Sequence, residues 1–449
     1  IKILVCDEFL NGCEIKSVRN KNISDKCWKC RFHQKNIIPL FGFEVLKLSD
    51  LISKNENDGL LIEASSHLSS KDLKLIKYGI DLYQSVNDSV IRYFYGAVPV
   101  DKAIVEKVKL NHIHTALLSL ETSKKIIEKW KPDIALGNMY TYSTWEPMFK
   151  YFRQLGVDYN SLSISQFDYN SILINQFEIY ENTERYNQFL NARNKTRLNK
   201  SEKYDLKLFF DNRFSGSSTI FKEQKYFSSY SDDEIIEKLK IDKSKRNLFL
   251  FSNVYWDVGM SDCSRLYNSI LDWVIDTVKI IKNNNNENIH LYLKPHPAEI
   301  FDTASSLRSV SQIVKETLKD LPDNFTIIDP ASKIKTYDLF QFIDLGIVFN
   351  GTLGLEMSWK NIPVVSTGKA PYTGLSIMSE PNSLEEYKDI LFGKKQTIKP
   401  DKKQLELFNY FYFVKTMLPF NLTHRAYSDN FKGYSFDKLD DLLPGHDAY

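Results

Sequence analysis

The apolar residues of the chain fall in short runs, each of which stops abruptly at polar or small residues. Such runs lie at 1–6, 42–47, 133–136, 247–252, 289–294, 325–328, 345–349 and 362–366. Short, nearly continuous apolar runs are typical of parallel strands buried on both faces of a sheet. Helices are predicted over 71–82, 114–130 and 264–281, and where Trp145, Met148, Phe152 and Leu155 recur at helical spacing. The alternation of strand, polar tip and helix predicts an α/β fold.

One charged stretch interrupts this alternation and divides the chain. Residues 1–195 are expected to form an N-terminal α/β domain, and residues 246–400 a second one. Residues 196–245, with a Gly-Ser patch at 215–218, are interpreted as a linker region that contains one helix. Residues 401–449 are expected to form a C-terminal helical segment. Its aromatic run at 408–413 is too apolar to stand free, so the segment should pack against a domain.

Composition narrows the class of protein without identifying it. A length of 449 residues fits two or three domains, and 13% aromatic residues indicate a globular chain. The net charge of +2 gives no strong field for polyanions, so no nucleic-acid partner is expected. No apolar run reaches roughly 18 residues and no signal peptide opens the chain, so a cytoplasmic location is expected. The chain begins at Ile1, and a longer parent protein is left open.

Four cysteines near the N-terminus raise the question of a metal. Cys27 and Cys30 are followed by His33 at a spacing that zinc sites use, and Cys13 or Cys6 could supply a fourth ligand. The second paired knuckle that makes such patterns specific is missing. Reduced, partly buried thiols in an ordinary loop are the favoured interpretation, and no metal is assigned.

Two strand ends carry residues that suit an anion. The sequence LYLKPHP at 291–297 ends a strand at Lys294. Pro295 and Pro297 forbid further strand pairing, so His296 is held on a stiff turn. His296 could donate a hydrogen bond or, as an imidazolium, neutralise a phosphate. The alternative is a turn histidine without a task.

The second strand end is FNGTLGLE at 349–356, where Asn350, Gly351 and Thr352 precede a helix. Small residues at a helix start leave backbone N–H groups that point at a ligand, usually a phosphate. The alternative is a tight turn that needs small residues. Glu356 lies one turn into this helix. There its carboxylate can reach paired sugar hydroxyls or complement the helix dipole.

A third polar cluster, NVYWD at 253–257, follows the strand at 247–252. Asp257 at its end could act as a nucleophile, a base or a metal ligand, or it could be an ordinary loop aspartate. The sequence does not choose a second carboxylate among the candidates of the N-terminal half, which are Glu146, Asp168, Glu178 and Glu181.

Two common nucleotide motifs are missing from the sequence. It has no Gly-x-x-x-x-Gly-Lys-Ser/Thr loop, which argues against an ATPase. It has no full Gly-x-Gly-x-x-Gly after the first strand, which argues against a dinucleotide enzyme. Two α/β domains with polar strand ends imply a cleft, where nucleotide donors commonly bind.

Taken together, three stretches resemble a known family: NVYWD at 253–257, LKPHPAE at 293–299 and NGTLGLEMSWKNIPVVSTGKAPY at 350–372. They are similar to the bacterial capsule and surface-polysaccharide glycosyltransferases, and most to the retaining β-Kdo transferases, which use CMP-Kdo. The resemblance covers roughly residues 247–375. In the N-terminal half it is limited to GNMYTYSTWEP at 137–147.

The resemblance implies a GT-B architecture, in which two Rossmann-like domains face each other across a cleft and a C-terminal helix packs back. The N-terminal domain would serve the acceptor and the C-terminal domain the nucleotide sugar. His296 and Thr352 would hold the nucleotide phosphate and Glu356 the ribose. Asp257 matches the aspartate implicated as a nucleophile in a double displacement. The remaining residues expected at the nucleotide are Asn253, Lys294, Pro297 and Gly351.

The resemblance therefore implies a glycosyltransferase of bacterial capsule or lipopolysaccharide biosynthesis. Its donor would be CMP-Kdo or a related CMP-activated sugar acid, and its acceptor a glycan or glycolipid. Gly351 and Thr352 stand where a Ser-Thr or Ser-Ser pair is frequent, so one hydroxyl is missing from the phosphate contacts and the donor is left open. No cofactor or metal is expected, because no Asp-x-Asp pair lies at a strand end. A polyol-phosphate transferase and a non-catalytic glycan-binding module are the alternatives. Peripheral contact with the inner membrane or with other polysaccharide-assembly enzymes is left open.

Overall fold

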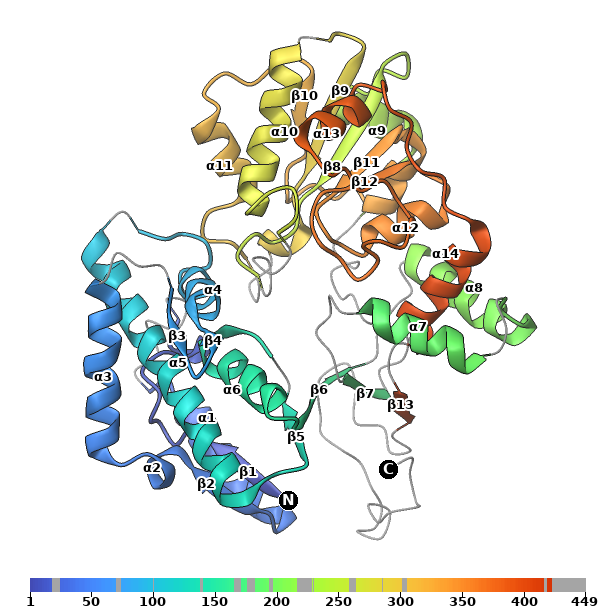
Figure 1. Cartoon of the computed structure of the whole chain (residues 1–449). Coiled ribbons are helices and arrows are strands. Elements are labelled where there is room, and N and C mark those ends of the chain that lie inside the picture. The colour runs from blue at the N-terminus through green and yellow to red at the C-terminus, as the bar shows by residue number, and fades with distance from the viewer. Residues whose placement is uncertain are drawn as a thin grey trace. The chain divides into compact units, whose positions relative to one another are not determined.

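The computed structural model divides into two compact units. It describes residues 1–17, 25–69, 74–99, 101–137, 140–164, 171–175, 182–193, 197–215, 228, 230–257, 264–284, 286–300, 305–415 and 418–421. Unit 1 contains Ile1–Asn160 and two short later segments, Trp256–Ser261 and Ser306–Arg308. Unit 2 contains Ser161–Tyr255, Asp262–Ser305 and Ser309–Tyr449. Figure 1 labels the helices and strands of the two units.

Unit 1 combines a short parallel sheet with long helices. Strand β1 (Lys2–Val5) pairs in parallel with β2 (Glu44–Lys47). The helices are α1 (Trp28–Phe32), α2 (Leu48–Leu51), α3 (Lys54–Ser69), α4 (Tyr83–Tyr93), α5 (Lys102–Trp130) and α6 (Tyr142–Gln154). Along the chain, strand β5 (Ile134–Gly137) follows α5 and precedes α6. The middle of α5 is buried against α3, α4 and α6, and it forms the centre of this unit's core.

The helix predicted over 71–82 is wrong. Among the described residues of that stretch, β3 (Ile76–Lys77) and β4 (Ile80–Asp81) form an antiparallel hairpin. Tyr78 and Gly79 connect the two strands, and both have positive φ angles, of 52° and 79°. Two successive residues with positive φ are typical of the tightest hairpin turns. The turn chemistry outweighed the helical spacing of the apolar residues.

Unit 2 is built on a five-stranded parallel sheet with the order β10-β9-β8-β11-β12. Its strands are β8 (Arg246–Phe251), β9 (Ile289–Lys294), β10 (Phe325–Ile327), β11 (Leu345–Val348) and β12 (Val364–Ser366). The five C-terminal strands predicted from the apolar runs are thereby confirmed. In chain order this is a 3-2-1-4-5 arrangement, which is Rossmann-like.

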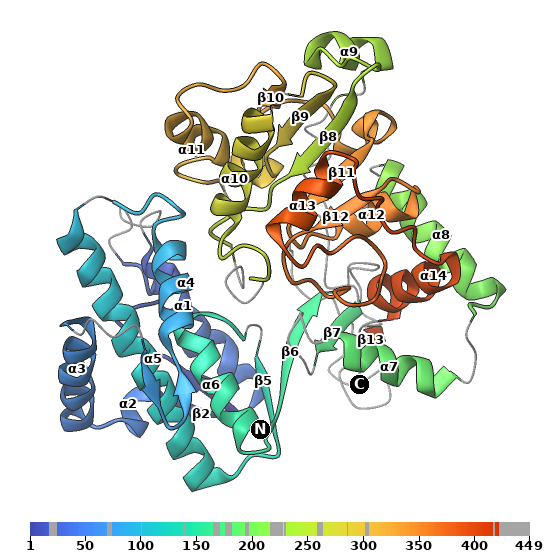
Figure 2. The ribbon, with the colours of Figure 1, turned by 45° about the horizontal axis from the view of Figure 1, so that its top comes forward.

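Helices cover both faces of this sheet (Figures 1 and 2). They are α10 (Ile270–Asn284), α11 (Val310–Thr317), α12 (Leu353–Trp359) and α13 (Leu384–Leu391). On one face, Trp273 of α10 donates to the hydroxyl of Tyr387 on α13 at 3.3 Å. On the other, Phe249 and Tyr292 share a hydrophobic cluster with Met357 of α12. Burial on both faces explains why the strands read as continuous apolar runs. The α/β, Rossmann-like fold predicted from the sequence is confirmed.

The predicted linker, residues 196–245, holds two helices that belong to the core of unit 2. Helix α8 (Lys200–Ser215) buries Phe209 and Phe210, and α9 (Asp232–Leu239) buries Ile235 in the same cluster. The terminal helix α14 (Lys402–Tyr410) packs against α8, as expected for its aromatic run. Helix α7 (Asn182–Arg193) contributes Tyr186, which meets Phe408 edge to face at 5.2 Å. The surface residues of α8 and α9 are largely charged, which is why residues 196–245 were interpreted as a linker.

A further group of strands forms antiparallel pairs. Strand β7 (Ser171–Asn175) pairs with β6 (Asp158–Ile164) and with β13 (Leu418–Asn421). No helix in the described part of the chain is long and apolar enough to cross a membrane. The arrangement of two domains across a cleft, which the resemblance implies, stays a prediction.

Candidate functional site

The topology of unit 2 singles out one edge of its sheet. The chain runs from β8 through β9 to β10 on one side of β8, and from β11 to β12 on the other. Strands β8 and β11 therefore flank the point where the strand order reverses. In open α/β sheets, ligands bind outside the carboxyl ends of the strands at this switch point. The NVYWD and FNGTLGLE sequences follow these two strands.

Two asparagines connect the two strand ends at the switch point. Asn253, after β8, donates through Nδ2 to Oδ1 of Asn350, after β11, at 3.0 Å. Gly351 comes next, and a Cβ at this position would lie 3.8 Å from Nδ2 of Asn253. The missing side chain of Gly351 thus leaves room beside the asparagine pair. Its carbonyl accepts a hydrogen bond from the Tyr372 hydroxyl at 3.0 Å, which fixes the turn.

Thr352 stands at the start of α12 but does not cap it. Its side chain makes no capping hydrogen bond, and its hydroxyl lies 3.4 Å from Oε1 of Glu356, one turn further on. The residue is half-buried. Thr352 thus presents a hydroxyl at the same edge of the sheet as Asn253 and Gly351.

His296 is exposed beyond the end of β9, as its position between two prolines predicts. The backbone N–H of Ala298 donates to its Nδ1 at 3.1 Å. An Nδ1 atom that accepts carries no proton, so in this arrangement the ring is the neutral tautomer with its N–H at Nε2. The structure therefore favours His296 as a hydrogen-bond donor over His296 as an imidazolium.

The turn that carries His296 is anchored by its neighbours. Pro297 opens a 3-10 turn, Pro297–Ile300. The buried carboxylate of Glu299 accepts the Val310 N–H at the start of α11, at 3.2 and 3.3 Å. Glu299 thus has a structural role, and Pro297 sets the direction of the turn rather than offering a polar group.

Lys294 does not face the open edge of the site. Its side chain is only 3% exposed, and Nζ donates to the carbonyl of Ile334 at 3.3 Å. Burial lowers the pKa of Lys294 to about 8. Alternation along β9 directs Lys294 to the same side as Tyr292, under helices that the sequence did not place. In this conformation Lys294 lies in the core and not among the residues that present polar groups to a ligand.

Glu356 is enclosed in a buried polar cluster. Its Oε1 accepts from Nε and Nη2 of Arg213, at 3.0 and 2.8 Å, and its Oε2 accepts from the Tyr337 hydroxyl at 2.9 Å. Glu356 is 1% exposed. Burial acts to lower the pKa of Arg213, but Glu356 and Tyr337 outweigh it and the pKa is raised. The carboxylate expected to hold the ribose therefore joins α12 to α8 in this structure.

Asp257 belongs to unit 1, whereas Asn253 belongs to unit 2. The Asp257 side chain is 53% exposed and forms an ion pair with Arg92 of α4, in which Nη1 and Oδ1 are 3.2 Å apart. The structure therefore brings together Asn253, Gly351 and Thr352 at one strand edge of unit 2. It places Asp257 among residues of unit 1.

Only one of the alternative carboxylates falls in the described residues. Glu146 is 4% exposed in α6 and pairs with Lys150 one turn further on. Asp168, Glu178 and Glu181 lie outside the described residues, as do Asn138 and Met139 of the GNMYTYSTWEP stretch.

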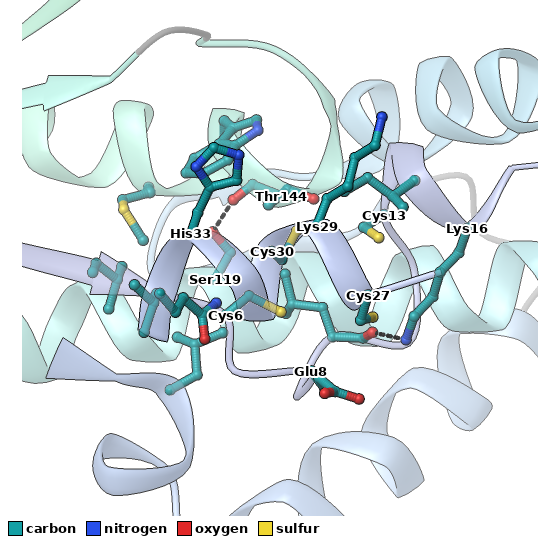
Figure 3. Close-up of a pocket in the computed structure, with 18 residues that line it drawn as sticks. Cys6, Glu8, Cys13, Lys16, Cys27, Lys29, Cys30, His33, Ser119 and Thr144 are labelled. Carbon is teal, nitrogen blue, oxygen red and sulfur yellow. Dashed lines mark hydrogen bonds between the residues drawn. The ribbon is translucent and has the colours of Figure 1, made fainter. Parts of the chain in front are cut away.

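The four N-terminal cysteines line a cavity of about 500 Å³ in unit 1 (Figure 3). The cavity lies at the carboxyl end of β1, between the loop that carries Cys6 and the start of α1 at Cys27. Burial raises the pKa of Cys6 and of Cys30. Among the described residues, no three His, Cys, Asp or Glu side chains are grouped to hold a metal ion.

The sequence alone assigns no role to four residues of these sites. Arg213 and Tyr337 lie far from Glu356 in sequence, and Arg213 falls in the predicted linker. Arg92 lies in a helix that carried no motif. Asn350 stands in a motif that was noticed, but its pairing with Asn253 needed the sheet order. The one signal in the sequence is that Arg213 stands among the aromatic residues of 209–214, which favours a buried arginine with a partner.

Neither a protein-family model nor a curated protein matches the chain. Two structures of Thermosulfurimonas dismutans KpsC are among the similar solved structures. The β-Kdo 2,4 transferase is 14% identical over 62% of this chain and 78% of that chain, with a TM-score of 0.39. The β-Kdo 2,7 transferase is 13% identical over 65% and 79%, with a TM-score of 0.36.

A third similar structure is the UDP-GlcNAc 2-epimerase of Methanocaldococcus jannaschii, in complex with UDP-GlcNAc and UDP. It is 11% identical over 91% of this chain and 97% of that chain, with a TM-score of 0.26. β-Kdo transferases, which the three motifs resemble, are thus among the similar structures. At these identities and TM-scores, function has to be argued from the residues of the chain.

Proposed function

We propose that the protein is a glycosyltransferase of bacterial surface-polysaccharide assembly that transfers a sugar from a nucleotide donor to a glycan or glycolipid acceptor. The observation that carries the proposal is the Asn253–Asn350 pair at the switch point of unit 2, with Gly351 and Thr352 beside it. This is the position at which open α/β sheets bind nucleotides. We assign the nucleotide of the donor to this edge.

The polar groups at this edge suit the leaving phosphate of a nucleotide sugar. When the bond between the anomeric carbon and the phosphate breaks, negative charge grows on the phosphate oxygens. Hydrogen-bond donors held in place before the reaction stabilise that charge. We assign this task to Nε2–H of His296 and the hydroxyl of Thr352. Asn253 and Asn350, already bound to each other, would orient the rest of the nucleotide.

The buried cluster around Glu356 constrains how the ribose binds. A carboxylate has about four acceptor positions, and Arg213, Tyr337 and Thr352 donate four hydrogen bonds to this one. We propose that a ribose hydroxyl takes the position that the Thr352 hydroxyl leaves when it turns to the phosphate, or replaces the hydroxyl of Tyr337. Arg213 then keeps the carboxylate in place while the ribose binds.

Asp257 is proposed as the catalytic carboxylate. It would attack the anomeric carbon or stabilise the positive charge that develops there. If it attacks, a second displacement by the acceptor gives a product that retains the donor's configuration.

A CMP-activated sugar acid is the proposed donor, and the cytoplasm is the proposed location. No metal is assigned a role.

A thermal-shift titration with CMP, CDP, UDP and GDP tests the nucleotide site. A ligand at 100 times its dissociation constant should stabilise the protein by about 2.7 kcal/mol. Cytidine without phosphate is the control, because it removes the groups that His296 and Thr352 would contact. Stronger stabilisation by CMP than by cytidine at the same concentration is expected. The absence of any shift with all four nucleotides would refute the donor site, and a shift with UDP or GDP alone would refute the CMP assignment.

A further inference from the structure

Asp257 makes an ion pair with a residue to which no role has been assigned. Arg92 lies in the last turn of α4, and its Nη1 is 3.2 Å from Oδ1 of Asp257. The two side chains are 26% and 53% exposed. A partly exposed ion pair of this kind contributes little to stability. The surroundings of Arg92 therefore have to explain why the pair is arranged as it is.

Aromatic rings surround the guanidinium of Arg92. Its central carbon lies 4.7 Å from the ring centroid of Trp256, 5.4 Å from that of Tyr95 and 6.0 Å from that of Tyr142. Trp256 and Tyr142 are 2% and 1% exposed, so neither ring is free to move. A guanidinium placed against rings keeps the N–H groups along its edge available for a carboxylate. Arg92 is therefore held in one orientation before any ligand binds.

The segment that carries Asp257 is fastened to the same rings. The indole N–H of Trp256 donates to Oγ of Ser306 at 2.7 Å, and the Leu307 N–H donates to the carbonyl of Tyr95 at 3.3 Å. Trp256 and Tyr95 meet edge to face, with centroids 4.7 Å apart. These contacts lie within unit 1 and fix the backbone next to Asp257. The ion pair with Arg92 fixes its carboxylate.

The backbone of Tyr142 adds a further constraint on the rings around Arg92. Its φ angle is +67°, in the left-handed region that bulky residues rarely adopt, although it is the first residue of α6. The next N–H, of Ser143, donates to Oγ of Ser89 on α4 at 2.8 Å. Strained residues persist where the surrounding structure holds them, and they cluster at active sites. Here the strain places the Tyr142 ring beside Arg92.

We propose that Arg92 is the positioning residue of Asp257. The inference rests on the proposed function, in which Asp257 meets the anomeric carbon of the donor. Arg92, clamped by Trp256, Tyr95 and Tyr142, binds one carboxylate oxygen and fixes the torsion of the Asp257 side chain. The carboxylate is then aligned before the sugar arrives. Arg92 itself touches neither the nucleotide nor the reacting carbon.

Two variants and a matched control test this role. Arg92→Gln should lower kcat by about 100-fold, because a misplaced reactive group loses roughly that factor. The dissociation constant for CMP should stay within about twofold, since the nucleotide contacts lie in unit 2. Arg92→Lys should recover part of the rate, because the charge returns without the planar edge. The control, Arg153→Gln, removes an exposed arginine 5.9 Å from the ring of Phe149 and should leave kcat unchanged.

Chemical rescue separates positioning from structural support. In Arg92→Ala, added guanidinium ion at concentrations below those that unfold the protein should restore part of kcat, because the aromatic clamp remains. Wild-type kcat in Arg92→Gln would overturn the inference alone. Loss of kcat with an equal loss of CMP binding, and no recovery with lysine or guanidinium, would also overturn it. Wild-type protein that never releases nucleotide from the donor would contradict the proposed function itself.

Discussion

The paired substitutions His296→Asn and His296→Gln test the tautomer that the structure assigns. Nδ1 of His296 accepts the Ala298 N–H at 3.1 Å, which leaves Nε2–H as the donor to phosphate. An asparagine amide reaches roughly the position of Nδ1, and a glutamine amide roughly that of Nε2. The asparagine variant therefore keeps the turn and loses the phosphate donor. The glutamine variant keeps a donor near the phosphate and loses the hydrogen bond within the turn.

The size of the effect follows from the bond that is removed. A hydrogen bond to a charged group contributes about 1.5 to 3 kcal/mol, which corresponds to a roughly 10- to 150-fold change in affinity. His296→Asn should weaken CMP binding by about this factor. His296→Gln should weaken it by less than about tenfold. Because His296 is exposed, the free energy of unfolding of both variants should lie within about 0.5 kcal/mol of that of the wild type.

Isothermal titration calorimetry with CMP, paired with urea unfolding, measures both quantities. Cytidine is the control ligand, since it should bind wild type and both variants alike. If Asn preserves CMP affinity while Gln abolishes it, Nδ1 is the contact and the tautomer assignment is wrong. If both variants lose stability in proportion to affinity, His296 is structural.

Three further predictions concern stability. Burial lowers the pKa of Lys294 to about 8, whereas the ordinary lysine pKa in an unfolded chain is about 10.4. Between these two pH values the unfolded chain binds a proton that the folded chain does not, so the free energy of unfolding rises with pH. Lys294→Met should remove this rise, on the order of 3 kcal/mol, in urea unfolding at several pH values, and an unchanged rise would exclude Lys294 as its source. Glu356→Gln should destabilise by about 3 to 5 kcal/mol by leaving Arg213 buried without its counter-charge. The control Asp211→Asn, which breaks an exposed pair with Lys207, should have almost no effect, and equal losses would contradict the reasoning. Gly368→Ala should destabilise by about 1 to 3 kcal/mol, because its Cβ would lie 2.9 Å from the Phe349 carbonyl oxygen. Gly59→Ala, in an open stretch of α3, should stabilise by about 0.5 to 1 kcal/mol, and calorimetric melting with the opposite order would refute both.

The sequence predicted the sheet of unit 2 because its strands are buried on both faces. Such strands appear as uninterrupted apolar runs, and those at β8, β9 and β11 end in polar residues that mark the ligand edge. The position of His296 followed from its two prolines. These features depend only on residues that are neighbours in the sequence, so the sequence alone could predict them.

The features that the sequence missed depend on contacts between distant residues. Nothing near Glu356 in sequence indicates that Arg213, 143 positions away, occupies its carboxylate. The same holds for Arg92 and Asp257, which are 165 positions apart. Lys294 ends a strand, and the sequence does not show that its side chain is buried and donates to the carbonyl of Ile334, 40 positions away. The hairpin at Tyr78 was missed because positive φ angles at a non-glycine residue leave no clear mark in the sequence.

The central claim is that the protein breaks the bond between a sugar and its nucleotide with the help of Asp257. Intact mass spectrometry of the protein mixed with CMP-Kdo alone, together with an assay for released CMP, tests it most directly. The account predicts CMP release and, if Asp257 attacks the anomeric carbon, an enzyme heavier by one sugar residue. It predicts neither in Asp257→Asn, although that variant still binds CMP. Wild-type protein that binds the donor but releases no CMP, with or without glycan acceptors, would contradict the account.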